Sequence, residues 1–164
     1  MKDKLLSKQG WVILLICIIS FFINNRVVVP DIMEARNMVT AREMVHDGNW
    51  LVPTMNGDLR LEKPPLPTWL TAVAEMISPD NLALQRAMAG FAAILLVAFF
   101  YLTAVQVMRN KRYAFISTIL LCTCYNIILM GRTASWDIYC HAFMMGAIYF
   151  LIKAFVTKAC SWKD

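Results

Sequence analysis

Residues 83–108 read ALQRAMAGFAAILLVAFFYLTAVQVM, and this stretch decides the fold. It is long and apolar enough to cross a bilayer as one helix, because about 20 apolar residues span the hydrocarbon core. The whole chain is 59% hydrophobic and 16% charged, and its mean hydropathy is +0.55. These values are far from those of soluble domains and predict an integral membrane protein.

Three further apolar runs accompany this stretch. The first follows a group of lysines and is not followed by a small-residue cleavage site, so we interpret it as a retained signal anchor. Another begins directly after the basic segment RNKR, and the last leads to the C-terminal lysines. The sequence therefore predicts an all-α membrane protein with about four transmembrane helices. Their expected positions are about 8–29, 83–108, 113–131 and 138–157.

Lysine and arginine residues near the helix ends predict the orientation. They cluster before the first membrane helix, between the second and the third, and after the fourth, and such clusters stay in the cytoplasm. The N-terminus is therefore expected in the cytoplasm and the long connection at residues 30–82 on the outer side. The net charge of +5 reflects this topology and not nucleic-acid binding, because the basic residues form no continuous stripe.

The outer connection contains two predicted interfacial helices. The first lies within residues 31–47, is amphipathic, and is ended by Asp47 and Gly48. The second begins at the prolines of residues 64–67 and carries Trp69 as an interfacial anchor. We expect the first helix to lie on the membrane surface, with its apolar face at the headgroup boundary.

Between these two helices lies the charged segment NGDLRLEKPPLPTW, residues 56–69. Pro64 and Pro65 hold the backbone in extended geometry, so Lys63 presents its ammonium group with less conformational freedom than an ordinary loop lysine. A cation held in this way beside a bilayer is suited to binding a phosphate group. The alternative interpretation is a solvated connector between two helices.

Longer motifs carry a resemblance to a known family. They are EARNMVTAREMVHDGNWLVPTMNGDLRLEKPPLPTWL at residues 34–70, an arginine at the head of the next membrane helix, and GRTASWD at residues 131–137. Together they resemble the N-terminal portion of the polyprenyl-phosphate-sugar-dependent glycosyltransferases of the GT-C fold. The aminoarabinose transferase and protein O-mannosyltransferase-like families, glycosyltransferase families 83 and 39, are the most similar. The resemblance covers about residues 30–140 and implies a partial GT-C fold for the chain.

The resemblance implies a reaction on the periplasmic face of a bacterial inner membrane. A sugar would leave a polyprenyl (undecaprenyl) phosphate and reach a lipid or protein acceptor, as in lipid A modification or protein glycosylation. An acid would act as base on the acceptor, and cations would stabilise the departing phosphate. The catalytic residues implied are Glu34 and Asp137, and the donor-phosphate ligands implied are Lys63, Arg36, Arg86 and Arg132. No cofactor follows from the residues themselves, although the resemblance allows a divalent metal at Glu62, with a further ligand from beyond residue 164.

One position departs from the family pattern. Members often carry Asp immediately before the glutamate, but this chain has Met33 there. The catalytic role is therefore expected to fall on Glu34, with Asp31 as the alternative. His141 shares a helix face with Asp137 and is expected to pack or hydrogen bond there, with a site or metal role as the alternative.

The length of the chain leaves several readings open. GT-C enzymes of this kind generally have many more membrane helices, so residues 1–164 are expected to be the N-terminal part of a longer enzyme. The alternatives are a non-catalytic membrane subunit and a protein that binds or transports the lipid carrier. A transporter is disfavoured, because such proteins place ionisable residues at mid-membrane and the interior stretches of the second and third apolar runs have none.

Overall fold

The structure is a computed structural model that describes residues 8–161, with side chains described up to residue 156. Almost all of its regular structure is helical, as the sequence predicts. The elements, in chain order, are α1 (Lys8–Phe22), α2 (Ile32–Asp47), β1 (Thr54–Met55), β2 (Asp58–Leu59), α3 (Pro65–Ile77), α4 (Leu82–Met108), α5 (Lys111–Cys122), α6 (Tyr125–Gly131) and α7 (Asp137–Ser161).

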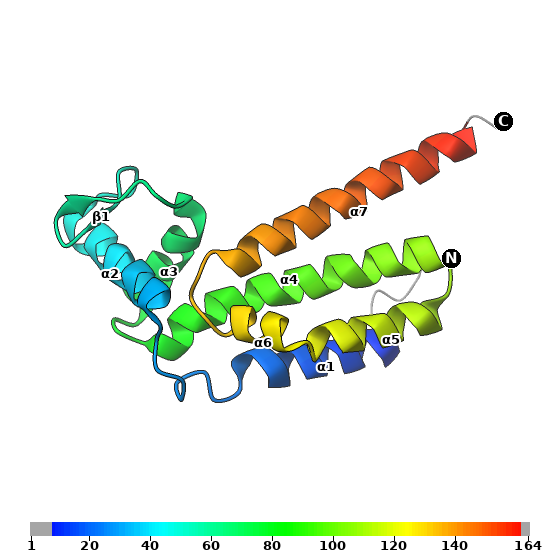
Figure 1. The fold of residues 1–164 in the computed structure, drawn as a ribbon, viewed down its shortest axis with the longest axis horizontal. Coiled ribbons are helices and arrows are strands. Elements are labelled where there is room, and N and C mark those ends of the chain that lie inside the picture. Colours follow the sequence, from blue (N-terminus) through cyan, green and yellow to red (C-terminus); the bar gives the residue numbers. More distant parts are fainter. Residues whose placement is uncertain (1–7, 162–164) are drawn as a thin grey trace.

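Helix α4 is the centre of a helical bundle. Helix α7 packs along it, and α5, α1 and α6 also contact it (Figure 1). Helices α2 and α3 and the β1–β2 hairpin lie together at one end of this bundle, beside the beginning of α4 (Figure 1). We call this group, residues 32–77, the cap region. The chain thus has an apolar bundle and a smaller region at one end of it.

Two of the described helices, α4 and α7, are long and apolar enough to cross a membrane. The pair α5 and α6 passes the same test together but is bent by 65°, so it adds a third span only if the bent pair crosses as one. Helix α1 is a shorter apolar helix of 15 residues. The described residues therefore contain two or up to three candidate spans, compared with the four or so expected from the sequence.

Two local features explain where the observed helices differ from the expected ones. Helix α1 ends before residue 29, because the buried Asn25 side chain donates to the Phe21 carbonyl at 2.7 Å and Asn24 adopts a positive φ of 57°. Helix α5 ends at Cys122, and the Thr123 hydroxyl donates to the Ile119 carbonyl at 3.1 Å. Such side-chain bonds to the backbone compete with helix continuation. The run expected as one helix at 113–131 is therefore a bent pair.

Small residues let the bundle helices approach closely. A Cβ atom added at Gly131 would lie 2.7 Å from the Phe21 ring, and one added at Gly146 would lie 2.9 Å from the Phe99 ring. Close backbone approach at small residues is typical of helices packed in membranes, where dispersion contacts replace the hydrophobic effect. The buried residues of this core are Ile13, Cys17, Phe21, Ala89, Ala92, Ala93, Leu96, Val97, Cys122, Ile138, Tyr139 and Ala142.

Both predicted helices of the outer connection are present. The Asp31 side chain caps α2 by accepting from the Glu34 N–H at 2.6 Å, and Gly48 ends the helix in the left-handed conformation with φ of 74°. Helix α3 begins at Pro65, where the missing N–H costs nothing. The face of α2 that packs on α3 is largely polar, while Ile32 is 79% exposed. Its buried residues are Glu34, Asn37, Thr40, Ala41 and Met44.

A two-stranded antiparallel hairpin between α2 and α3 was not expected. Its turn is Asn56–Gly57, and both residues have positive φ, which is the combination that tight hairpin turns require. The Glu43 carboxylate of α2 accepts from the Thr54 hydroxyl at 2.7 Å and the Asn56 N–H at 2.5 Å. Although burial alone would raise the pKa of Glu43, these hydrogen bonds lower it. The hairpin is therefore anchored to α2, and it delivers the loop that carries Arg60 and Lys63.

Candidate functional site

A buried ion pair joins the cap region to the bundle. Arg86, at the beginning of α4, donates from Nε and Nη2 to the two carboxylate oxygens of Glu34 in α2, at 2.6 and 2.8 Å. Arg86 is 1% exposed and Glu34 is 0% exposed. Because the two-point geometry satisfies both groups, the pair can exist without solvent.

The remaining donors and acceptors of this pair are also engaged. Arg86 Nη1 donates to the Asn25 carbonyl at 2.5 Å and the Val28 carbonyl at 2.8 Å. Glu34 Oε1 also accepts from the Ala134 N–H at 2.9 Å. The pair therefore ties four segments together: the connection after α1, the beginning of α2, the beginning of α4 and the loop before α7.

Asn37 contacts the same loop at the carbonyl group of Ala134, the residue whose N–H donates to Glu34. Its amide nitrogen donates to the Ala134 carbonyl at 2.8 Å and to the Thr71 hydroxyl at 3.1 Å, and its oxygen accepts from the Thr68 hydroxyl at 2.7 Å. Glu34 and Asn37 are one helical turn apart, so they bind the N–H and the C=O of Ala134 from one face of α2. This contact, which we call the Ala134 clamp, positions the residues that follow.

The clamp places Trp136 beside two cations of the cap region. The Arg60 Cζ atom lies 5.1 Å from the centroid of the Trp136 ring, and the Lys63 Nζ atom lies 5.4 Å from it. Trp136 is 5% exposed, whereas Lys63 is exposed. Both distances are within the range of cation–π attraction. Residues from two segments far apart in the sequence therefore form one cluster, Arg60–Lys63–Trp136.

Arg60 was not expected as a site residue, and it is the unusual member of this cluster. It is 5% exposed, and its Nη1 donates to the Arg36 carbonyl at 2.5 Å and the Thr40 hydroxyl at 2.7 Å. Its Nε and Nη2 atoms are buried without a hydrogen-bond partner. Burial lowers the pKa of Arg60, Arg36 lowers it further, and Glu62 opposes the shift. The only sequence signal was its place in the charged loop that also holds Lys63.

Asp137 lies next to this cluster. It is the first residue of α7 and is exposed, directly after the buried Trp136. His141 makes the hydrogen bond expected of it, but to the backbone: its Nδ1 lies 2.6 Å from the Asp137 carbonyl oxygen. Asp137 is therefore an exposed acid that directly follows Trp136 of the cluster in the chain.

The other residues implied by the resemblance lie in two places. Arg36 forms an exposed ion pair with Glu62 at 3.3 Å, which joins α2 to the Lys63 loop. Arg132 lies instead at the end of α1, where it donates to the Ile23 carbonyl at 2.6 Å and the Ser20 carbonyl at 3.2 Å. Arg36, Glu62 and Asp137 thus lie on the segments that carry the cluster, while Arg132 satisfies helix-end carbonyls elsewhere. In the described part of the chain, no three His, Cys, Asp or Glu residues gather as a metal site.

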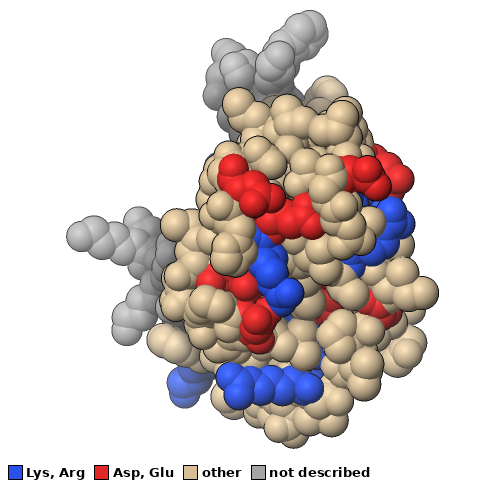
Figure 2. Space-filling model, turned by 90° about the vertical axis from the view of Figure 1, so that its left-hand side faces the viewer, with Lys and Arg blue, Asp and Glu red and all other residues tan. Residues whose placement is uncertain are grey.

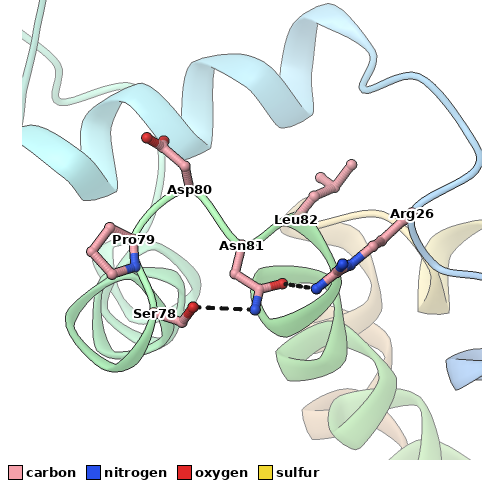
Figure 3. Close-up of a pocket in the computed structure, with 6 residues that line it drawn as sticks. All are labelled: Arg26, Ser78, Pro79, Asp80, Asn81 and Leu82. Carbon is pink, nitrogen blue, oxygen red and sulfur yellow. Dashed lines mark hydrogen bonds between the residues drawn. The ribbon is translucent and has the colours of Figure 1, made fainter.

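On the outer face of the cap region, acidic and basic side chains are interspersed among other residues (Figure 2). A separate pocket of about 390 Å³ lies at the turn between α3 and α4, where Arg26 donates to Asn81 Oδ1 at 3.2 Å (Figure 3). The residues lining it are Arg26, Ser78, Pro79, Asp80, Asn81 and Leu82. None of the predicted site residues lines this pocket.

Several known proteins are similar to the chain. Undecaprenyl phosphate-alpha-4-amino-4-deoxy-L-arabinose arabinosyl transferase of Pseudomonas savastanoi pv. phaseolicola is 34% identical over 92 residues, which are 56% of this chain and 17% of that protein. The protein of the same name from Shewanella sediminis is 31% identical over 108 residues, 66% of this chain and 19% of that protein. An uncharacterized protein of Aquifex aeolicus is 26% identical over 156 residues, 93% of this chain and 31% of that protein.

The fold has a counterpart among solved structures. The crystal structure of ArnT from Cupriavidus metallidurans bound to undecaprenyl phosphate matches with a TM-score of 0.72 at 20% identity, over 89% of this chain and 27% of that one. The chain therefore spans less than a third of the length of these relatives. The family model described as dolichyl-phosphate-mannose-protein mannosyltransferase matches residues 10–164. A match over nearly the whole chain, together with this fold, means that the protein belongs to the dolichyl-phosphate-mannose-protein mannosyltransferase family of GT-C membrane glycosyltransferases.

Proposed function

We propose that the chain is part of a membrane glycosyltransferase that takes a sugar from a polyprenyl-phosphate donor and transfers it to a lipid or protein acceptor. The family supports this, and the two named relatives act with an undecaprenyl-phosphate-linked aminoarabinose. One observation carries the proposal. The Lys63 ammonium group lies 5.4 Å from the centroid of the Trp136 ring, and Trp136 directly precedes the exposed Asp137, so folding brings a cation to the segment that carries an acid.

The two exposed residues have complementary roles in this reaction. Lys63 attracts the donor phosphate and stabilises the charge that develops on it as the sugar leaves. Asp137 accepts the proton of the acceptor hydroxyl, and a carboxylate open to solvent at a helix end is suited to that task. Arg36 supports Lys63 indirectly, because its ion pair with Glu62 holds the loop on which Lys63 lies.

The buried residues contribute by positioning. Both oxygens of Glu34 are already engaged with Arg86 and the Ala134 N–H, which favours a role through the Ala134 clamp over direct proton transfer. Asp31, the alternative base, caps α2. Arg86 and Arg132 likewise donate to protein oxygens, so their part in donor binding is to hold the surrounding segments. Glu62, whose exposed carboxylate pairs with Arg36, is the residue proposed to contribute to a divalent-metal site.

The site is proposed to face the periplasm of a bacterial inner membrane. The clusters of lysine and arginine at the opposite helix ends support this orientation through the positive-inside rule. A reporter fused after Lys111 should score as cytoplasmic, and one fused near Asn56 should score as periplasmic. The reverse result would place the Lys63 loop on the wrong side for this function.

A second candidate is a non-catalytic subunit that binds the lipid carrier. The engagement of Glu34 with Arg86 and of Glu62 with Arg36 favours it, because among the described residues these two acids are already paired. Met33, an exposed apolar side chain, occupies the position where relatives often carry an acid.

Binding and turnover measurements on the protein in lipid nanodiscs separate these candidates. Lys63→Ala should weaken binding of undecaprenyl phosphate at least about tenfold, because it removes a charge from a poorly screened site. Lys111→Ala, on an exposed residue of the distant α5, is the matched control and should bind normally. An unchanged affinity in Lys63→Ala would contradict the proposal.

Asp137→Asn tests the second half of the proposal. It should retain donor binding and lose transfer from an undecaprenyl-phosphate-linked sugar, since the amide cannot accept the proton. Normal transfer in Asp137→Asn would exclude this residue as the base. Carrier binding by the natural sequence without any transfer would favour the non-catalytic subunit.

A further inference from the structure

Arg60 is a buried cation whose hydrogen-bonding capacity is only partly used. Its Nη1 has two partners, the Arg36 carbonyl and the Thr40 hydroxyl, but both are neutral oxygens. Its Nε and Nη2 have no partner. An arginine does not escape this situation by losing its proton, because its guanidinium stays charged under all ordinary conditions.

In the described part of the chain, no carboxylate lies within ion-pair distance of Arg60. Glu62 is near enough to oppose the lowering of the Arg60 pKa, but its carboxylate pairs with Arg36 at 3.3 Å. A buried charge without a counter-ion is strongly unfavourable, whereas a charge that meets an anion is not. The position therefore has the character of a site whose counter-ion comes from a ligand.

The neighbours of Arg60 offer further donors to the same ligand. Trp136, whose ring lies against the guanidinium, has an indole Nε1 that is also buried without a partner. Lys63 lies 5.4 Å from the centroid of the same ring and is exposed. Two cations and an indole N–H combine charge with several N–H donors, and this is the combination that oxyanions such as phosphate bind best.

We propose that Arg60 and the indole N–H of Trp136 form a binding position for a phosphate oxyanion, which enters past Lys63 and becomes the missing counter-ion. Because the free donors are buried, the side chains around them, Trp136 among them, shift when the anion binds. The assignment of the phosphate to a lipid carrier rests on the proposed function, but the oxyanion position itself does not. A free phosphate ion satisfies the same chemistry.

The test measures binding to the whole chain in nanodiscs, with undecaprenyl phosphate as one probe and inorganic phosphate as the other. Arg60→Gln should weaken binding of the effective probe at least about tenfold, because it removes the charge and both free donors. Arg112→Gln, an exposed arginine at the start of α5, is the matched control and should bind as the natural sequence does. Circular dichroism of each variant confirms that it is folded.

Trp136 provides a second readout that does not depend on changing Arg60. Binding should alter tryptophan emission, and this change should disappear in Trp136→Phe, which keeps a ring but loses the N–H. Trp136→Phe should also bind the probe more weakly. If Arg60→Gln does not fold, unchanged affinity and an unchanged emission response in Trp136→Phe overturn the proposal.

The outcomes separate this inference from the proposed function. Weakened binding in Lys63→Ala with normal binding in Arg60→Gln overturns the Arg60 position and leaves the proposed function intact. Binding of inorganic phosphate that depends on Arg60, without binding of undecaprenyl phosphate, supports the oxyanion position and contradicts the proposed function. Loss of undecaprenyl phosphate binding in both variants supports both.

Discussion

Arg86 and Arg60 are both buried, but their guanidinium groups have very different hydrogen-bond partners. Arg86 meets the carboxylate of Glu34 at two points and gives its third nitrogen to two carbonyls. Arg60, also buried, has no carboxylate partner in the described residues and leaves two nitrogens without acceptors. Burial alone therefore does not assign a role to an arginine. Its partners do, and they make Arg86 a structural element and Arg60 a candidate for a ligand.

The two sites are connected through the loop before α7. The Ala134 clamp shares Glu34 with the Arg86 ion pair, because the Glu34 carboxylate accepts from both Arg86 and the Ala134 N–H. Trp136, two residues later, contacts the Arg60 guanidinium through its ring. A group whose buried charges are paired thus supports one with unused donors, which is the arrangement expected where preorganisation serves binding.

Removing the Arg86 guanidinium should have the largest effect on the stability of the fold. Arg86→Met should lower the free energy of unfolding by about 3–5 kcal/mol, because it leaves the Glu34 carboxylate buried and unpaired. Thermal unfolding in detergent micelles measures this. The double variant Glu34→Met with Arg86→Met is the control and should recover most of the loss, because it removes both charges. A stable single variant would refute the structural role of Arg86.

Weakening the Ala134 clamp should have an intermediate effect on the stability of the fold. Asn37→Leu leaves the Ala134 carbonyl and two threonine hydroxyls without their partner, and should cost about 1–3 kcal/mol of unfolding free energy. Emission from Trp136 should also change, since the clamp positions its loop. Asn126→Leu, on an exposed residue of α6, is the control and should change neither quantity. Unaltered emission in Asn37→Leu would separate the clamp from the Trp136 cluster.

Removing the Arg60 charge should have the smallest effect on stability. Arg60→Met loses two hydrogen bonds to neutral oxygens but also removes a buried cation that lacks a counter-ion, so the free energy of unfolding should change by no more than about 1 kcal/mol. The same unfolding measurement, made without phosphate, checks this. A loss as large as that of Arg86→Met would make Arg60 structural and abolish the contrast between the two sites.

Several elements could be predicted because their signals are local. The Gly48 end of α2, the proline start of α3 and the long apolar runs of α4 and α7 are all present in the structure. Each of these features depends on a few neighbouring residues or on the composition of one continuous segment. The shorter α1 and the break between α5 and α6 were missed, because Asn25 and Thr123 act through single side-chain bonds to the backbone that an apolar run conceals.

By itself, the sequence determined the membrane class, the family resemblance and the order of the helices that its local signals predict. Each of these follows from residues adjacent in the chain. Only the tertiary structure decided which charges are paired, because Glu34 and Arg86 meet across 52 positions and Ala134 joins them from 100 positions beyond Glu34. Arg60 gained its significance in the same way. A charge in a sequence has no partner until folding supplies one, and the energy of a buried charge depends almost entirely on that partner.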